Sequence, residues 1–491
     1  MGLGLLILVS VGKENIYLSA QPEITFFKIA YKRYTNFSCE PIPQYFKTTP
    51  NFGAKCTINL AKNADLLSSM FLYVELPNIQ MENFTNNISN FAWVKKIGIA
   101  LINYVEIEIG GYVIDRHYGD WINIWNEITR KNSTYKSYNK MIGNISELTS
   151  YTQTKTSTIL YIPLSFWFCL DTGLALPLIA LTHNDIKINV QFNDINTCYN
   201  ISPSNFINVT NNICIYKQGE YFYQNYQNNK IIGEFIYFDP IKQYLYYNPI
   251  KGVFVIPPLN NSSNTYNLIG YDSQYIMNIV PGSVVIQNDD YFKFNKPSLI
   301  TSFMLVDYIY LDNYERAKFL NNSHEYLIPI VQTVSDQIIY SMNFGYKLPL
   351  INPVKLLVWR GLLVSNSNND QFNYTTTPYT DKEEDIIIKN LLIINSINRM
   401  DLDSIEYYSY IPRYQYGLGN ENGIYMYSFA LNPKDIQPSG SMNFSKVDDA
   451  YLQLKLNKIV NYQNPVAFKC YAVQYNLLRI SYGIGGLVFN E

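Results

Sequence analysis

The segment from Gly423 to Leu456 constrains the fold more than any other stretch of the chain. It begins with an apolar and aromatic run, Ile424 to Leu431, which is short and tyrosine-rich and therefore typical of a strand. Pro433 and the turn-forming residues 437–440 end this run, because proline has no N–H for a strand ladder. A second run, Ala450 to Leu456, alternates polar and apolar side chains. The order strand, rigid corner, strand predicts part of an antiparallel β-sandwich without a catalytic group.

Several segments also resemble one known family in the same order along the chain. The stretch YSFALNPKDIQPSGSMNFS, at 427–445, resembles the signature near the C-terminus of the major capsid proteins of nucleocytoplasmic large DNA viruses. Four further segments resemble that family: ITFFKIAYKRYTNFS at 24–38, WINIWNEIT at 121–129, FWFCLDTGLALPLIAL at 166–181 and FMLVDYIYL at 303–311. The resemblance covers most of the chain outside 193–300.

The resemblance implies an all-β fold, a double jelly roll. It consists of two consecutive eight-stranded antiparallel jelly rolls with loop insertions and a few short helices. We expect an N-terminal arm at 1–24, a first jelly roll at 25–312, a linker helix at 313–327 and a second jelly roll at 328–491. The stretch 193–300 is rich in apolar and aromatic residues, which argues against disorder, so we expect a long insertion with strands of its own.

The resemblance further implies a structural protein with no catalysis and no cofactor. It implies a homotrimeric, pseudo-hexagonal capsomer in the outer icosahedral capsid shell of a double-stranded DNA virion, assembled in the host cytoplasm. The implied partners are the chain itself, neighbouring capsomers, minor capsid proteins and penton proteins. The N-terminal arm would reach an internal membrane, beneath the shell.

Composition excludes several other classes of function. The net charge is −2 and no Lys/Arg block occurs, so we expect no direct contact with nucleic acid, which requires many cations. The apolar run at 3–11 is far shorter than the roughly 20 residues of a membrane span. Six scattered cysteines without a C-x-x-C pair, and only three histidines, indicate free thiols and no metal site.

Local patterns predict three further elements. A Gly110-Gly111 turn inside an alternating run, at 105–114, predicts a hairpin. Asp120 is expected to cap a helix, and Asp312 with Glu315 three residues later forms a capping-box-like start of a second helix. The first of these helices carries an apolar stripe at helical spacing, formed by Trp121, Ile124, Trp125 and Ile128.

The second half of the chain repeats the same alternation of short strands and Pro/Gly turns. The expected strands are Asp336–Asn343, Val354–Arg360, Ile386–Ile394, Ile424–Leu431, Ala450–Leu456 and Ala467–Ile480. A strand ending at Phe192 is expected in the first half from the alternation of Ile186, Ile188 and Val190 with polar residues.

Glu106 and Glu108 are the strongest candidates for a catalytic acid pair. Two residues apart on one strand, they would lie about 6.5–7 Å apart, close to the spacing of an inverting glycosidase. Their alternation with apolar residues explains them equally as the solvated face of a hairpin, which is the interpretation we adopt. We therefore assign no catalytic, cofactor-binding or metal-binding residue. Among many sequons, Asn261 and Asn373 lie in the most loop-like stretches and are candidate glycosylation sites.

Two alternatives to a capsid shell protein remain open at this point. A poxvirus-type membrane scaffold would share the fold but form a transient lattice. A carbohydrate-binding or carbohydrate-cleaving β-sandwich would use the pair Glu106 and Glu108.

Overall fold

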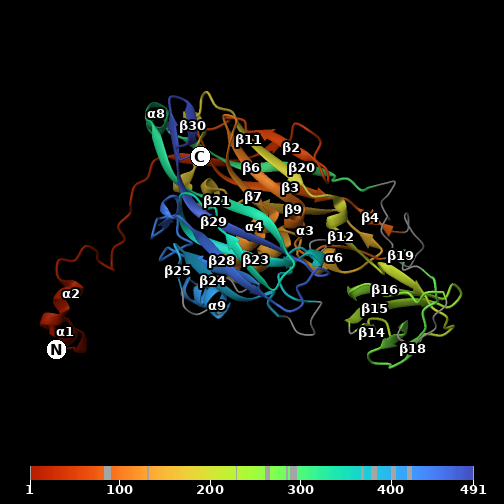
Figure 1. Ribbon diagram of the computed structural model, residues 1–491. Helices are drawn as coiled ribbons and strands as arrows, with labels where there is room; N and C mark the ends of the chain where they lie inside the picture. The colour runs from red at the N-terminus through yellow and green to blue at the C-terminus, as the bar shows by residue number, and fades with distance from the viewer. Residues whose placement is uncertain are drawn as a thin grey trace.

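Two antiparallel β-sandwiches, packed side by side, form the body of the molecule (Figure 1). The computed structural model describes residues 2–81, 90–129, 132–227, 229–259, 266–283, 286–287, 296–366, 370–377, 384–399, 405–416 and 423–489. Each sandwich pairs a larger sheet with a four-stranded sheet. The expectation of an all-β double jelly roll is confirmed.

The first sandwich is built from residues 37–192 and 301–311. Its larger sheet contains β1 (Phe37–Tyr45), β20 (Thr301–Leu311), β3 (Leu66–Leu76), β10 (Leu176–Pro177) and β9 (Thr158–Pro163). Its four-stranded sheet contains β2 (Lys55–Asn59), β11 (Ile186–Phe192), β6 (Ile102–Ile109) and β7 (Tyr112–Tyr118). Short strand pairs and helices lie at its ends: β4 (Ile79–Gln80) with β8 (Thr154–Lys155), β5 (Asn90–Trp93) with β12 (Tyr199–Ser202), α3 (Ile97–Ala100), α4 (Gly119–Thr129), α5 (Tyr135–Met141), α6 (Ser146–Thr149) and α7 (Trp167–Leu170).

The hairpin predicted around Gly110-Gly111 is confirmed as β6 and β7. Ile109 pairs with Tyr112, so the two glycines form the whole turn. Both have positive φ, +60° and +91°, which is the reason a tight hairpin turn of this hand selects glycine. The alternation predicted for the strand that ends at Phe192 is also confirmed, because Ile186, Ile188 and Val190 are buried.

The second sandwich follows α8 (Asn313–Asn321). Its larger sheet contains β21 (His324–Ile339), β29 (Val466–Ser481), β23 (Pro353–Leu363), β26 (Ile424–Ser428), β27 (Met442–Asn443) and β30 (Ile484–Leu487). Its four-stranded sheet contains β22 (Asn343–Lys347), β28 (Ala450–Leu456), β24 (Ile387–Ile394) and β25 (Ile397–Asn398). The cap of α8 agrees with the sequence, since the Glu315 N–H donates to Asp312 Oδ1 at 2.8 Å.

Three details of the second half differ from the sequence prediction. The strand expected at 336–343 is wrong, because β21 ends at Ile339 and β22 begins at Asn343. The strand expected to run to Leu431 ends at Ser428, whose hydroxyl accepts from the Ala430 N–H and donates to the Ala430 carbonyl, which turns the chain. A helix that the sequence analysis did not predict, α9 (Ile405–Tyr416), precedes β26.

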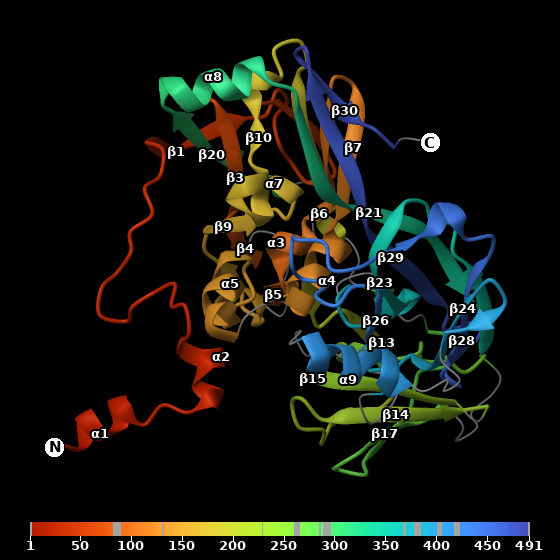
Figure 2. The same ribbon diagram turned by 90° about the vertical axis from the view of Figure 1, so that its left-hand side faces the viewer.

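The insertion has its own sheet and its own core, and the expectation of strands within it is confirmed. Seven strands form the sheet: β13 (Asn205–Asn208), β14 (Tyr221–Tyr226), β15 (Asn229–Asp239), β16 (Tyr244–Lys251), β17 (Leu268–Gly270), β18 (Ile276–Met277) and β19 (Ile286–Gln287). Its buried residues, from Ile207 to Ile279, form a cluster separate from those of the sandwiches. The sheet lies outside the two sandwiches as a third body (Figures 1 and 2).

The N-terminal segment leaves the body of the molecule. It contains the short helices α1 (Leu3–Val9) and α2 (Ile16–Ser19), neither of which buries a residue. Figure 2 shows the segment extending away from both sandwiches before it enters β1. Its apolar side chains are therefore exposed in the isolated chain; Phe26 and Phe27, for example, are both more than nine-tenths exposed.

Candidate functional site at the junction of the two sandwiches

Helix α4 forms the main wall between the sandwiches. The predicted stripe (Trp121, Ile124, Trp125 and Ile128) is buried, which confirms the helix. Its partner is the larger sheet of the second sandwich, where the stripe packs on residues of β23, β26 and β29: Leu356, Val358, Leu362, Ile424, Met426, Tyr471 and Val473. A continuous apolar contact of this kind holds the two halves in one fixed orientation.

Asp120 does not cap α4, which corrects the sequence prediction. The helix begins one residue earlier, at Gly119, where a Cβ would lie 2.2 Å from the carbonyl oxygen of Ile102. The Asp120 carboxylate instead points across the junction. Its Oδ2 accepts from Arg360 Nε at 2.8 Å and lies 2.6 Å from Arg360 Nη2. The hydroxyls of Tyr471 and Tyr374 complete the cluster by donating to Oδ2 and Oδ1.

The charges of this cluster stabilise one another. Burial raises the pKa of the Asp120 carboxyl, but the Arg360 charge and the three donors outweigh burial and lower that pKa overall. Burial and the Asp120 charge raise the pKa of both Tyr374 and Tyr471 well above its usual value, so their hydroxyls stay protonated donors. The side chains of Arg360 and Asp120 are only 7% and 16% exposed. The sequence gives no local signal for this pair, because its members are far apart in the chain.

Two long strands also tie the halves together. β21 and β29, of 16 residues each, pair along almost their whole length. Ile328 and Leu478, near one end of the pair, are buried in the core of the first sandwich. Ile339 and Phe468, near the other end, are buried in the core of the second. The paired strands β21 and β29 therefore contribute side chains to both cores.

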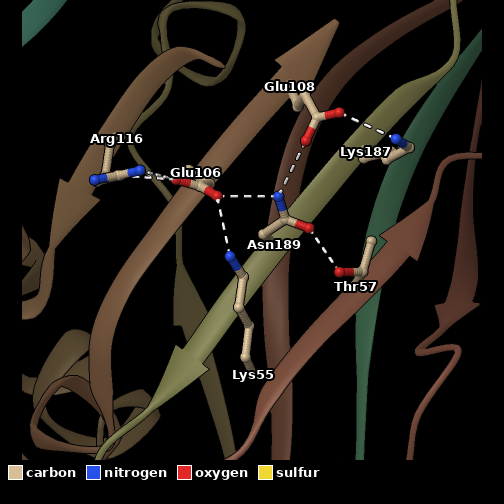
Figure 3. Close-up of polar contacts among 7 residues, drawn as sticks. All are labelled: Lys55, Thr57, Glu106, Glu108, Arg116, Lys187 and Asn189. Carbon is tan, nitrogen blue, oxygen red and sulfur yellow. Dashed lines mark hydrogen bonds and ion pairs between the residues drawn. The ribbon is translucent and has the colours of Figure 1, made fainter. Parts of the chain in front are cut away.

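Glu106 and Glu108 lie on β6 and face neighbouring strands, as Figure 3 shows. The prediction of a solvated face is wrong for Glu106, which is 3% exposed. Arg116 on β7 covers it, with Nη2 2.6 Å from Glu106 Oε2, and Asn189 on β11 donates to Oε1 at 3.0 Å. Long cationic side chains of the adjacent strands shield the carboxylate while their own ends reach solvent.

The remaining contacts extend this network across the four-stranded sheet (Figure 3). Lys187 Nζ lies 3.0 Å from Glu108 Oε1, Lys55 Nζ lies 3.8 Å from Glu106 Oε1, and the Thr57 hydroxyl donates to Asn189 Oδ1 at 2.7 Å. Each carboxylate is thus held by fixed cations and amides. A catalytic carboxyl must be within reach of a substrate, and in this arrangement the oxygens of both groups are already occupied by partners on the same sheet.

Histidines and cysteines are dispersed through the fold. His117 on β7 is buried against Phe166, and its Nε2 lies 3.0 Å from Asp115 Oδ2. All six cysteines are free. Burial raises the pKa of the Cys169 and Cys198 thiols to about 12, which keeps them protonated and poor metal ligands. Within the described ranges no three His, Cys, Asp or Glu side chains gather in a metal-binding group.

Of the two candidate glycosylation sites, Asn373 lies in a loop between β23 and β24. The Asn373 side chain is half-buried, and its Nδ2 donates to Asp370 Oδ2 at 2.8 Å and to the Thr377 carbonyl at 3.1 Å. Its sequon threonine, Thr375, donates to Asn373 Oδ1 at 2.7 Å. Asn261 lies outside the described residues. Both sites stay predictions.

Two antiparallel sandwiches packed together in one chain define a double jelly roll, and solved structures of capsid proteins share this fold. The Faustovirus major capsid protein aligns with a TM-score of 0.68 at 12% identity, over 96% of this chain and 94% of that one. The crystal structure of PBCV-1 VP54 aligns with a TM-score of 0.63 at 23% identity, over 95% of this chain and 100% of that one.

Comparison of the sequence with known families identifies the family to which the chain belongs. Residues 25–239 match the family model for the major capsid protein N-terminus, and residues 315–486 match that for the large eukaryotic DNA virus major capsid protein. Probable capsid protein 4 of Acanthamoeba polyphaga mimivirus is 35% identical, over 99% of both chains. The major capsid protein of Pyramimonas orientalis virus is 31% identical, over the full length of both. The chain belongs to the family of large eukaryotic DNA virus major capsid proteins. It is a structural component of the virion capsid and not an enzyme.

Proposed function

We propose that three copies of this chain form a homotrimeric, pseudo-hexagonal capsomer of an icosahedral shell. The observation that carries the proposal is the junction described above, which fixes two similar sandwiches side by side as one body. Three such bodies around a threefold axis present six similar corners, a shape that tiles a nearly hexagonal layer. A closed ring of three uses a different surface on each side of every contact, and obligate contacts of this kind usually bury roughly 2,000 Å² or more.

The oligomeric state tests this proposal directly. Size-exclusion chromatography with light scattering on the full chain is expected to give about three times the monomer mass of 56.9 kDa. The trimer should persist on dilution to low micromolar concentration. A stable monomer at that concentration would contradict the proposal.

We also propose that the N-terminal arm, residues 1–24, reaches an internal membrane beneath the shell. The apolar side chains of α1 are exposed and none is buried by the described residues, which supports a partner outside the chain. Within the described residues, no helix is long and apolar enough to cross a membrane. The full chain is expected to float with anionic lipid vesicles, whereas a variant lacking residues 2–24 stays in the dense fraction and remains trimeric.

The proposal extends to the setting of assembly. Neighbouring capsomers, minor capsid proteins and penton proteins are the proposed partners, nucleic acid is not, and assembly is placed in the host cytoplasm. The proposed units are the arm, a first jelly roll to residue 312 with the insertion at 193–300, a linker that contains α8, and a second jelly roll. The helix expected over 313–327 is shorter, because α8 ends at Asn321 and β21 begins at His324. Quantitative mass spectrometry of mature virions separates this function from that of a transient scaffold, which would be nearly absent from them.

A further inference from the structure

A cavity of about 510 Å³ opens at the junction of the two sandwiches. Its walls come from both halves of the chain. Trp121 and Trp125 of α4 and His117 of β7 line it from the first sandwich, and Val331, Lys355 and Val473 line it from the second. The loop at 434–436, which lies inside the segment that resembles the family signature, closes one side.

The polar group that distinguishes this cavity is Lys355. It is 2% exposed, on the central strand β23, and its Nζ donates to the backbone carbonyl of Asp435, at 3.3 Å. The ring of Tyr475 lies 5.4 Å from Nζ. Within the described part of the chain, no carboxylate lies within ion-pair distance of Lys355. The neighbouring buried lysine Lys469 differs, since its Nζ lies 3.2 Å from Asp336 Oδ1.

Burial of the Lys355 cation is costly, because the Asp435 carboxylate, which also lines the cavity, offsets the desolvation of the ammonium only in part. The residues on either side of Lys355 in β23, Val354 and Leu356, are apolar and buried. The indoles of Trp121 and Trp125 stack on each other, with ring centroids 5.4 Å apart and an interplanar angle of 26°, and both line the same cavity. The exposed side chain of Lys434 adds a second positive charge at the mouth.

We propose that this cavity binds a small organic acid, with its carboxylate against Lys355 and its flat or alkyl body against Trp121 and Trp125. The buried ammonium of Lys355 beside the indoles of Trp121 and Trp125 matches a monoanion with an apolar body. The bound acid would join the two sandwiches through contacts with both, and so it would stabilise the junction on which the capsomer depends.

The test uses the full-length protein and two matched probes, indole-3-acetate and its neutral amide, indole-3-acetamide. Calorimetric titration is expected to show saturable binding of one acid per chain, at least about tenfold tighter than the amide. Because Trp121 and Trp125 line the cavity, tryptophan fluorescence should change with the same saturation curve. Octanoate replaces the aromatic body with an alkyl one, and inorganic phosphate tests a purely ionic site.

Variants separate the cavity from nonspecific binding. Lys355→Met removes the charge but keeps an apolar side chain of similar length, and it is expected to weaken acid binding by at least about tenfold. Lys355→Arg should retain binding, as should Lys458→Met, a control at an exposed lysine outside the cavity. Lys434→Ala, on the exposed loop, should weaken binding by a smaller factor without affecting the fold.

Several results would overturn the inference. Equal affinity for acid and amide, undiminished binding to Lys355→Met, or tighter binding of phosphate than of either organic acid would each do so. So would the absence of saturation by both acids up to about 1 mM. If no acid binds and Lys355→Met instead shifts the oligomeric state in light scattering, the cavity serves a side chain of a second copy, and the small-molecule inference is wrong. Trimer formation by the unaltered chain is measured separately, so the two proposals fail independently.

Discussion

Asp120 and Arg360 form an ion pair across the junction of the two jelly rolls, with Arg360 Nη2 2.6 Å from Asp120 Oδ2. Asp120 lies on the helix that the first half contributes and Arg360 on the central strand of the second half. Arg360 Nη1 also donates to the carbonyl of Ala467 at 2.8 Å, so the guanidinium is fixed on both sides. The pair thus joins halves that the chain itself connects only through α8.

Removing one member of this pair is expected to destabilise the protein strongly. Asp120→Asn leaves the Arg360 charge largely buried without an anion, which typically costs about 3–5 kcal/mol. Chemical denaturation followed by fluorescence should show the loss. The exposed pair Lys347–Asp449, 3.2 Å apart, provides the control, since Asp449→Asn should change stability by less than about 1 kcal/mol.

The same pair predicts how the protein responds to acid. The pKa of Asp120 is lower in the folded chain than in the unfolded chain, because Arg360 and three donors favour the carboxylate over the burial that opposes them. Its stabilising contribution is therefore fully present above the unfolded pKa of about 4 and is lost as the pH falls through the folded pKa. Stability measured from pH 6 down to about pH 3 should fall less steeply in Asp120→Asn than in the unaltered chain. Parallel curves would contradict this assignment.

Gly119 at the start of α4 is expected to tolerate no side chain. An alanine Cβ would lie 2.2 Å from the Ile102 carbonyl oxygen and 2.9 Å from that of Ile99, and both are backbone atoms. Gly119→Ala should therefore shift α4 and lower stability by more than about 3 kcal/mol, measured by thermal unfolding. Gly345→Ala is the matched control, because a Cβ there meets no atom within 4 Å. Similar melting temperatures for the two variants would show that the backbone at 119 relaxes freely.

The sequence predicted elements whose cause is local and missed those whose cause is distant. The Gly110-Gly111 hairpin and the cap by Asp312 depend on residues within a few positions, and both are confirmed. The partner of Asp120 lies 240 residues away, so helix-capping rules assigned the carboxylate a local role. In the same way, alternation along β6 placed Glu106 on the outer face but gave no indication that Arg116 of β7 and Lys55 of β2 cover it.

Helix α9 shows why a tertiary contact can override local preference. Its sequence, IEYYSYIPRYQY, is rich in tyrosine and contains Pro412, so helix propensity is weak. The helix is held by its buried face. Tyr408 packs against Trp359, with ring centroids 5.5 Å apart, and Arg413 Nη2 donates to the Ile424 carbonyl at 2.9 Å. Neither contact is visible from the local pattern.

The insertion is expected to lose its structure independently of the sandwiches. Phe222 is fully buried in its core and stacks on Phe254 with ring centroids 5.1 Å apart. Phe222→Ala should cost about 3–5 kcal/mol. Because the core of the insertion is separate, hydrogen exchange should speed up in β14 and β15 while β23 and β29 keep their protection. Tyr221→Ala, at a half-exposed neighbour, should leave exchange nearly unchanged, and a loss of protection that spreads to β29 would contradict the separation.

Lys355 predicts an unusual rise of stability with alkaline pH. Burial lowers the pKa of its ammonium to about 8, against a weaker opposing effect of Asp435. The unfolded chain, with the ordinary lysine pKa of about 10.4, therefore holds more protons between pH 8 and pH 10.4. As the pH rises through that window, the titration of Lys355 therefore raises the free energy of unfolding, by at most about 3 kcal/mol. Below pH 8 the full cost of burying the charge is present.

The difference in the free energy of unfolding between the unaltered chain and Lys355→Met, measured at several pH values, isolates the titration of Lys355 from that of all other groups. In the absence of ligand, the variant should be more stable at pH 7, because methionine fills similar space without a charge to desolvate. The advantage should shrink as the pH approaches about 10, which urea denaturation of both proteins at several pH values will show. Lys458→Met, at an exposed position, should show no such pH-dependent difference. If the difference in stability between Lys355→Met and the unaltered chain stays the same at every pH, a group close to Lys355 must stabilise its charged form.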